Sequence, residues 1–335
     1  MKRIVNLVPI VLVLAGVLGH SAAGQVKLAQ TGMKFLSVGT DARASALGDA
    51  YTAMDGNAGS LFYNPAGMAR QVSLVSVGLG QTQWIADINH NYISAAFAPW
   101  RGEYGVIGVM AQTVDYGELQ GTIRSDNEQG YIDMGNFTPR GTMIGIGYAR
   151  ALNDKFSVGG SAKWVRQNLG PAAIGVTPGG LELSSNVTSV VAFDFGIMYR
   201  TGFESLTFGM AVRNFSKEAQ FQSEGFQLPL TFRIGMSLNV IDVLPLDGEM
   251  HSFMFAVDAE HPRDFKEQIK IGGEYTFMKI LSLRLGYVTP ADEHGVSYGV
   301  GLQKDLTGVG LGVDYAYVPF GVFGNVHRFS FQFWL

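Results

Sequence analysis

The chain ends on the stretch HRFSFQFWL (residues 327–335), in which a large apolar side chain recurs at every second position. The four recurring residues are Phe329, Phe331, Phe333 and Leu335. A period of two is the period of a β-strand, so these side chains point to one face. Such a face either packs into a core or lies against lipid, because an exposed strand this aromatic would aggregate. We expect a strand that assembles into a larger sheet, and the rest of the chain decides what its aromatic face meets.

The beginning of the chain has the pattern of a secretory signal peptide. Lys2 and Arg3 precede a mainly apolar run over residues 4–18, and small residues follow at 21–24. A basic start, a short apolar stretch and a small-residue exit are typical of a cleaved signal. The alternative is a membrane anchor, but the run is shorter than the ~20 residues that a spanning helix needs. We expect residues 1–24 to be removed on export.

Composition narrows the functional classes. The 335 residues include 44 glycines and no cysteine, 12% are aromatic and 16% charged, and the formal net charge is -4. A mildly acidic chain without a basic stripe argues against nucleic acid as a partner. The lack of cysteine excludes a disulfide framework and thiol catalysis. After residue 24 no stretch has the length and hydropathy of a spanning helix, so a membrane crossing would require a closed barrel.

From residue 72 onward the sequence divides into fourteen segments with an alternating pattern, and an even number of strands of this length is typical of an outer-membrane barrel. Tight connections alternate with longer ones, as they do between periplasmic turns and extracellular loops. We therefore predict an all-β fold, an antiparallel transmembrane barrel of about fourteen strands over residues 70–335. The segments are 72–80, 91–98, 103–114, 138–150, 155–168, 187–200, 205–214, 229–241, 250–260, 267–277, 280–289, 295–303, 309–318 and 326–335.

The two faces of these segments differ in chemistry. In 205–214, for example, Phe208 and Met210 alternate with Gly209 and Ala211. Charges within the segments fall on the less apolar face, where a lumen accepts them, whereas lipid would make each Arg or Lys cost ~2–4 kcal/mol. This disfavours the alternative of a soluble β-sandwich. The balance of signs predicts a lumen charge network with a structural role rather than an ion-selective filter. Its members are Lys163, Asp194, Arg213, Arg233, Asp258, Glu260, Lys270, Glu274, Arg284 and Asp314.

Residues 25–69 do not follow the strand pattern. The stretch after Asp41 reads as a short helix with Asp41 as its N-cap and with Ala46, Ala50 and Ala53 on one face. A fourteen-stranded barrel encloses real space, and about 45 residues directly before the first strand could fill it. We interpret residues 25–69 as a partly helical hatch in the lumen. The alternative is a periplasmic tail.

Two motifs now support a resemblance to a known family. The stretch DARASALGDAYTAMDGNAGSLFYNPAGMA (41–69) resembles the N-terminal hatch signature of the FadL-like outer-membrane barrels, most closely that of the PorV/PorQ family. GNVHRFSFQF (324–333) resembles the closing strand of the same family. The matching hatch positions are Arg43, Gly48, Tyr63, Asn64, Pro65, Ala66 and Gly67.

The resemblance implies a fourteen-stranded protein of the bacterial outer membrane that takes part in type IX secretion. PorV-like members bind the C-terminal signal domain of exported cargo and pass it to a cell-surface attachment complex. The FadL likeness alone would instead imply a transporter for hydrophobic small molecules. Both functions stay open at the level of the sequence, with outer-membrane lipid, secreted cargo and other secretion components as the expected partners.

Signals of catalysis and metal binding are missing from the sequence. None of the five histidines after residue 24 has another histidine at metal-ligand spacing, and there is no Walker loop and no G-x-S-x-G elbow. His327 and Ser330, three residues apart on a strand, would point to opposite faces, which argues against a hydrolase. We expect no enzyme activity, no cofactor and no metal.

Partner contacts are expected outside the lipid belt, in the longer connections at roughly 81–90, 115–137, 169–186 and 215–228. The aromatic candidates there are Trp84, Tyr116, Tyr131 and Phe137. Aromatic anchors among polar groups are typical of binding hot spots. The alternative is that they belong to the aromatic girdle of the barrel, and Tyr131, far from any expected strand, discriminates best between the two.

Overall fold

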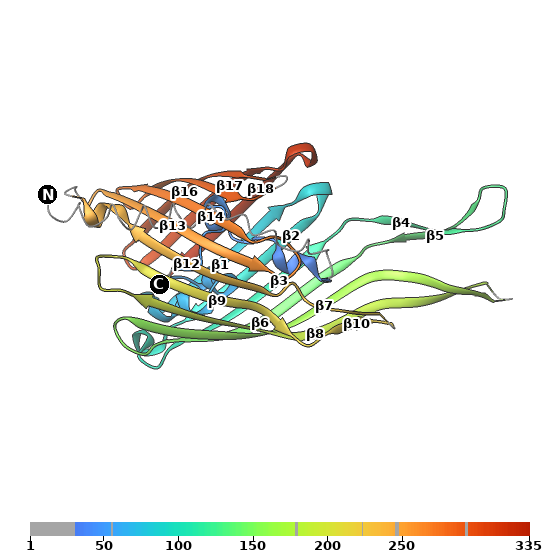
Figure 1. The fold of residues 1–335 in the computed structure, drawn as a ribbon, viewed down its shortest axis with the longest axis horizontal. Helices are drawn as coiled ribbons and strands as arrows, with labels where there is room; N and C mark the ends of the chain where they lie inside the picture. Colours follow the sequence, from blue (N-terminus) through green and yellow to red (C-terminus); the bar gives the residue numbers. More distant parts are fainter. Residues whose placement is uncertain (1–30, 55, 178–179, 223, 245–247, 292–293) are drawn as a thin grey trace.

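The protein forms a closed barrel of fourteen antiparallel strands, seen in a computed structural model (Figure 1). The structure describes residues 31–335 except 55, 178–179, 223, 245–247 and 292–293. The expected signal peptide therefore lies outside the described residues. The closed sheet and its strand number confirm the fold predicted from the alternating segments.

Each expected segment corresponds to one barrel strand, paired with its neighbours along the chain around the wall. The barrel strands are β1 (Val75–Gln83), β2 (Asn89–Phe97), β3 (Val106–Asp115), β6 (Arg140–Ala151), β7 (Phe156–Thr177), β8 (Gly180–Arg200), β9 (Thr207–Ser216), β12 (Thr231–Asn239), β13 (His251–Pro262), β14 (Gln268–Phe277), β15 (Leu281–Thr289), β16 (Val296–Leu306), β17 (Val309–Pro319) and β18 (Asn325–Trp334). Short 3₁₀ turns η4 (Ile85–Asp87), η5 (Pro99–Gly102), η6 (Val240–Val243) and η7 (Gly321–Phe323) join some of them.

The last strand, β18, closes the barrel by pairing with β17 on one side and with β1 on the other. Phe329 and Phe331 are exposed on its outer face, and so is Leu335 directly after it, while Arg328 and Ser330 are buried on its inner face. A closed sheet whose outer face is aromatic and whose inner face is polar is the arrangement of a barrel in lipid. The terminal stretch is therefore a lipid-facing strand.

The longer connections are more regular than expected. Two hairpin arms project from one end of the barrel (Figure 1): the separate sheet of β4 (Leu119–Arg124) and β5 (Tyr131–Phe137), and the outer parts of β7 and β8. A small sheet of β10 (Ala219–Phe221) and β11 (Glu224–Phe226) lies in the connection from β9 to β12. The expectation of loops at 115–137, 169–186 and 215–228 was wrong in this respect. Both faces of the β4–β5 hairpin are largely exposed, so no apolar alternation marked its strands in the sequence.

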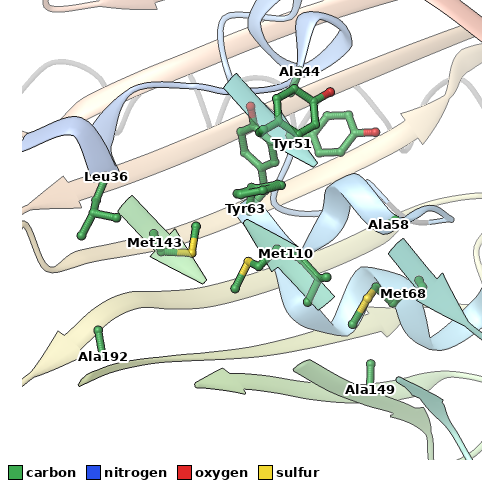
Figure 2. Packing of buried hydrophobic residues seen from close by; sticks show 14 of the residues in the cluster. Leu36, Ala44, Tyr51, Ala58, Tyr63, Met68, Met110, Met143, Ala149 and Ala192 are labelled. Carbon is green, nitrogen blue, oxygen red and sulfur yellow. The ribbon is translucent and has the colours of Figure 1, made fainter. Parts of the chain in front are cut away.

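The inner segment, residues 33–70, lies against the inner face of the wall. It contains η1 (Lys34–Ser37), α2 (Ala42–Ala46), η2 (Ala58–Phe62) and η3 (Pro65–Arg70). Its aromatic and aliphatic side chains form the largest buried cluster together with inward-facing residues of the strands. Figure 2 shows Tyr51 and Tyr63 of this segment near Met110 and Met143 of the wall; the two tyrosine rings have centroids 5.2 Å apart.

The inner segment also holds both strands of the closing seam. The backbone N–H of Ala42 donates to Ser330 Oγ on β18 at 2.8 Å, and that of Ala58 donates to Ser76 Oγ on β1 at 3.2 Å. The side chain of Asn57 donates to Gln332 Oε1 on β18 at 3.2 Å. Because β1 and β18 pair with each other, these bonds bridge the seam from within the lumen.

Helices contribute little to the architecture. In the described part of the chain, none of the helices combines the length and the apolar character needed to cross a bilayer. The expected helix after Asp41 is shorter than predicted, since α2 ends at Ala46. Gly48 and Asp49 follow with φ of 66° and 61°, a left-handed conformation that ends a helix.

Candidate functional site

The contact between α2 and the wall depends on small residues on both sides. Asp41 caps α2 as expected, and its carboxylate accepts a hydrogen bond from the N–H of Ala44 at 3.0 Å. Ala46 faces Gly299 of β16, where an added Cβ would lie 2.3 Å from that of Ala46. At Gly286 of β15 an added Cβ would lie 2.1 Å from the backbone nitrogen of Gly48. The alanine- and glycine-rich composition therefore allows helix and strand backbones to approach closely.

The second half of the hatch motif is held by the side chain of Asn64. Its Nδ2 donates to the carbonyl of Thr52 at 2.7 Å and to that of Ile197 on β8 at 3.1 Å. Its Oδ1 caps η3 by accepting from the N–H of Ala66. Pro65 at the first position of η3 has no N–H that would need a partner. One side chain thus ties two parts of the inner segment to the wall.

Gly67 lies in the same turn, tightly packed against Gly56 and Ser60. Its carbonyl accepts from the N–H of Gly56 at 2.9 Å, and an added Cβ would lie 2.8 Å from Ser60 Oγ. Tyr63, just before the turn, is 2% exposed and its hydroxyl donates to Asp49 Oδ1 at 3.4 Å. The motif positions therefore share one task in the structure, which is dense packing of the inner segment against the barrel.

We expect Gly196→Val to displace the inner segment. A Cβ at this position of β8 would lie 1.9 Å from Asn64 Oδ1, so the asparagine has to move and its bonds to Thr52 and Ile197 are lost. Overpacking of this kind costs roughly 1–3 kcal/mol of stability. The measurement is the temperature of the gel-mobility shift of the folded barrel. Gly160→Val on β7 is the control, because the nearest heavy atom to its added Cβ lies 3.3 Å away. Equal shifts in the two variants would contradict the assigned role of Asn64.

The expected lumen charges form ion pairs that include the inner segment. Arg43 of α2 binds Glu274 of β14 with two parallel hydrogen bonds, Nε to Oε2 at 2.8 Å and Nη2 to Oε1 at 2.6 Å. Arg284 of β15 also pairs with Glu274, and its Nη1 lies 2.7 Å from Asp314 Oδ1 on β17. These side chains are largely buried, so a chain of four charges joins α2 to three strands. The ion pair of Arg43 with Glu274 was not predicted, because the strand alternation does not show which strand a residue on a short helix faces.

The remaining expected charges fall into smaller groups. Lys163 pairs with Asp194 at 2.7 Å, and Glu260 pairs with Arg233 at 2.8 Å and also with Lys270. Asp258 forms no ion pair with the described residues. Instead it accepts from the N–H groups of Tyr51 and Thr52 and from the Thr52 hydroxyl. It thus fixes the inner segment to β13.

Arg213 is the other expected charge without an ion pair among the described residues. Its guanidinium lies 5.8 Å from the ring centroid of Tyr63, in a cation–π position. Both Arg213 and Asn214 oppose the single residue Asp194 across β8 and β9, which is a β-bulge. The bulge turns Asn214 inward, where its side chain accepts from Lys163 Nζ at 2.6 Å. Strict alternation does not predict such a residue.

A cavity of about 340 Å³ lies between the inner segment and the wall, near the strand ends from which the hairpins project. Asp49 and Ser45 form part of its floor, and Lys270, Arg328 and Trp84 part of its wall. Burial tends to raise the pKa of Asp49, but Lys270, Arg328 and Arg233 outweigh it and lower the pKa below its usual value. The cavity therefore carries ionised groups.

Arg328 was missed among the lumen charges. It is buried on the inner face of β18, where its Nε donates to the carbonyl of Gly39 at 3.2 Å and its guanidinium stacks on Trp84 at 5.3 Å. The alternation in the sequence could have identified Arg328 as an inward-facing charge, since it precedes the outward-facing Phe329 and Phe331 in the terminal stretch.

Of the four aromatic candidates for partner contacts, one is free on the surface. Trp84 packs against Phe320 at a centroid distance of 4.8 Å and lines the cavity, and the hydroxyl of Tyr116 accepts from Gln167. The ring of Phe137 packs against Gly170, so closely that a Cβ added to Gly170 would lie 2.2 Å from the ring. Tyr131, at the outer end of the β4–β5 hairpin, is 44% exposed.

A comparison with protein families decides the relationship. A family model described as type IX secretion system protein PorV matches residues 21–241, well over half of the chain. The chain belongs to the PorV family. No curated protein sequence matches it.

Solved structures show that the PorV-family barrel has the fold of known channels. The toluene transporter TodX of Pseudomonas putida aligns with a TM-score of 0.56 at 13% identity, over 92% of this chain and 98% of that one. The monoaromatic hydrocarbon channel CymD gives 0.54 at 14% identity, over 88% and 96%. The Ralstonia pickettii toluene transporter TbuX gives 0.54 at 12%, over 88% and 97%. At these identities the likeness shows the fold, a FadL-like barrel.

Together the family and the fold indicate a protein of the outer membrane. Within the described residues no cluster of three or more histidines, aspartates or glutamates has the geometry of a metal site.

Proposed function

We propose that this protein is a non-enzymatic component of type IX secretion that binds exported cargo and passes it on at the cell surface. The observation that carries the proposal is the PorV-family match over residues 21–241. In this proposal residues 1–24 are cleaved on export, residues 25–69 act as a hatch, and residues 70–335 form the transmembrane barrel. The hydrogen bonds and ion pairs between the inner segment and the wall support the role of a hatch.

We infer that cargo contacts the β4–β5 hairpin. This hairpin projects beyond the barrel end that carries the long connections, the extracellular end of such barrels (Figure 1). Tyr131 and Ile132 on β5 and Leu119 on β4 are large apolar side chains exposed on it. Tyr131 and Ile132 lie at the outer end of the hairpin, beyond the reach of lipid, so a protein partner is the natural cover for them.

Deletion of residues 120–134 is expected to abolish the retention of cargo on cells while the barrel still assembles. The deletion removes most of a sheet that pairs only with itself, so the barrel wall keeps all its strand pairs. Retention is measured by recovery of a secreted cargo protein with the affinity-tagged barrel, and assembly by the heat-dependent shift in gel mobility.

Single substitutions sharpen this experiment. Tyr131→Ala should lower cargo recovery several-fold, whereas Tyr104→Ala should leave it unchanged, because Tyr104 is a similarly exposed tyrosine near η5 at the opposite end of the barrel. Full recovery with the hairpin deleted would refute this contact and direct attention to the cavity between the inner segment and the wall.

A second candidate function is a FadL-type conduit for hydrophobic small molecules. The fold shared with TodX, TbuX and CymD favours it, as does the cavity of about 340 Å³ at the mouth. The acidic and basic side chains of Asp49, Lys270 and Arg328 at that cavity favour polar occupants instead. Co-purified hydrocarbon or lipid inside the barrel would support the conduit, and its absence together with cargo binding would support the secretion role.

A further inference from the structure

The outer wall of the barrel carries a hollow of about 620 Å³ in the lipid-facing surface of strands β2, β3, β6, β7 and β8. Three alanines on the outer face, Ala95, Ala111 and Ala162, form its base, because they are small where the neighbouring positions are large. The side chains that frame the hollow are Ile93, Val109, Ile144, Ile146, Trp164 and Val191. All six are exposed large hydrophobic residues, so the hollow lies in the apolar belt of the wall.

Two arginines stand at one end of this hollow. Arg166 follows Trp164 on the outer face of β7, and it pairs across the sheet with Thr142 of β6. Arg140 lies two residues before Thr142 on β6, so the two arginines are diagonal neighbours with Cβ atoms roughly 7 Å apart. Both side chains are exposed, and neither forms an ion pair with any residue that the structure describes.

The position of the pair identifies the leaflet. Arg140 begins β6 directly after the β4–β5 hairpin, and Arg166 lies just before β7 continues beyond the barrel. The long connections of such barrels are extracellular, so the arginines lie at the outer boundary of the hydrocarbon. Asp115, across from Arg140 on β3, is the acidic residue on the same face, and it leaves the cluster with a net positive charge.

We propose that the hollow and the two arginines form a binding site for a single phosphorylated lipid of the outer leaflet, with the chemistry of lipid A. One acyl chain fills the hollow over the three alanines, and the phosphate lies between Arg140 and Arg166. Guanidinium groups bind phosphate with paired hydrogen bonds, and exposed arginines at a headgroup boundary have this partner at hand. An apolar hollow with two cationic side chains beyond its outer end matches both parts of such a lipid and neither a neutral hydrocarbon nor a free ion.

The test measures lipid retention by native mass spectrometry of the protein released from membranes into mild detergent and titrated with purified lipid A. The wild-type protein should keep one lipid A per barrel. Arg140→Gln combined with Arg166→Gln should weaken retention at least tenfold. Arg150→Gln is the matched control, because Arg150 is exposed on the same outer face of β6 at its other end.

A second pair of variants tests the hollow itself. Ala162→Leu fills it and should also weaken retention about tenfold, whereas Ala259→Leu, on the outer face of β13 across the barrel, should not. Dephosphorylated lipid A should bind the wild type as weakly as lipid A binds the double arginine variant. Gel mobility confirms that each variant is folded.

Three outcomes would overturn the proposal. These are a wild-type protein that retains no lipid A, equal losses in the arginine variant and in Arg150→Gln, and retention unchanged by Ala162→Leu. A partner protein that co-purifies with the wild type and is lost on filling the hollow would reassign the site to protein association. The cargo experiment is independent of each of these results.

Discussion

Replacement of Glu274 by alanine is expected to destabilise the protein by about 3–5 kcal/mol, the usual cost of removing one partner from a buried ion pair. Glu274 accepts two hydrogen bonds from Arg43, and it also pairs with Arg284. Arg284 keeps Asp314, but Arg43 loses its carboxylate while it stays largely enclosed between α2 and the wall. The expected result is a lower denaturant midpoint for the barrel unfolded from lipid vesicles.

Two further variants separate charge from packing. Replacement of both Arg43 and Glu274 by methionine should recover much of the loss, since it removes the unpaired charge and keeps the volume. Glu249→Gln should change the stability little. The side chain of Glu249 is 91% exposed, and its Oε2 lies 3.9 Å from Lys279 Nζ, a surface ion pair that contributes at most ~1 kcal/mol. If the double methionine variant is no more stable than Glu274→Ala, the pair is not what holds α2 to β14.

Phe331→Lys is expected to destabilise the barrel by about 2–4 kcal/mol, the cost of a lysine on the lipid face near the midplane. Phe331 pairs with Leu79 of β1 and with Val313 of β17, so it lies in the apolar centre of the belt at the closing seam. The measurement is the free energy of unfolding from vesicles, with the yield of assembled barrel as a second readout. Phe331→Leu should cost much less, because it keeps the outer face apolar.

The control for the lysine itself is Val322→Lys. Val322 is 89% exposed in η7, in the turn between β17 and β18, where water solvates a charge. If Phe331→Lys is as stable as this variant, the outer face of β18 does not meet lipid.

The barrel was predictable because one physical rule acts along every strand. Because lipid lies outside and a polar lumen inside, the two faces of a strand carry different side chains. On β9, Phe208 and Met210 face outward and are large and apolar, whereas Gly209 and Ala211 face inward and are small. Inward charges such as Lys163 and Glu274 were found in the same way, since position in the alternation decides their side of the wall. Arg213 was found by this rule as well, but its neighbour Asn214 was not, because the bulge breaks the rule at that point.

The inner segment could not be predicted at the same level of detail. Its conformation depends on the space that the wall leaves, which is not encoded in local pattern. The alanines around α2 predict a longer helix by propensity, but the close approach to the wall, where Ala46 meets Gly299 and Gly48 meets Gly286, requires small residues at these positions. The partnership of Arg43 with Glu274 joins residues from distant parts of the chain, and no local signal predicts it.

The outer hairpins could not be predicted for a different reason, which is the lack of any apolar face in their strands. Beyond the lipid belt both faces of a strand meet water, so the consecutive residues Leu119 and Gln120 of β4 are both exposed and no side of the hairpin is consistently apolar. The same lack of constraint leaves Tyr131 free to be read as a contact residue, whereas Trp84 and Phe137, which looked similar in sequence, are occupied by packing.

The bonds from the inner segment to both strands of the seam bear on the order of assembly. Ser76 and Ser330 belong to strands from the two ends of the barrel sequence, and bringing such distant strands together is the step with the largest loss of chain entropy. Residues 42–58 bind both serines, so they can hold the first and last strands in register before the sheet is complete. We expect the inner segment to serve as an internal template around which the wall closes, so that a chain lacking it would be slow to mature even where every strand is intact.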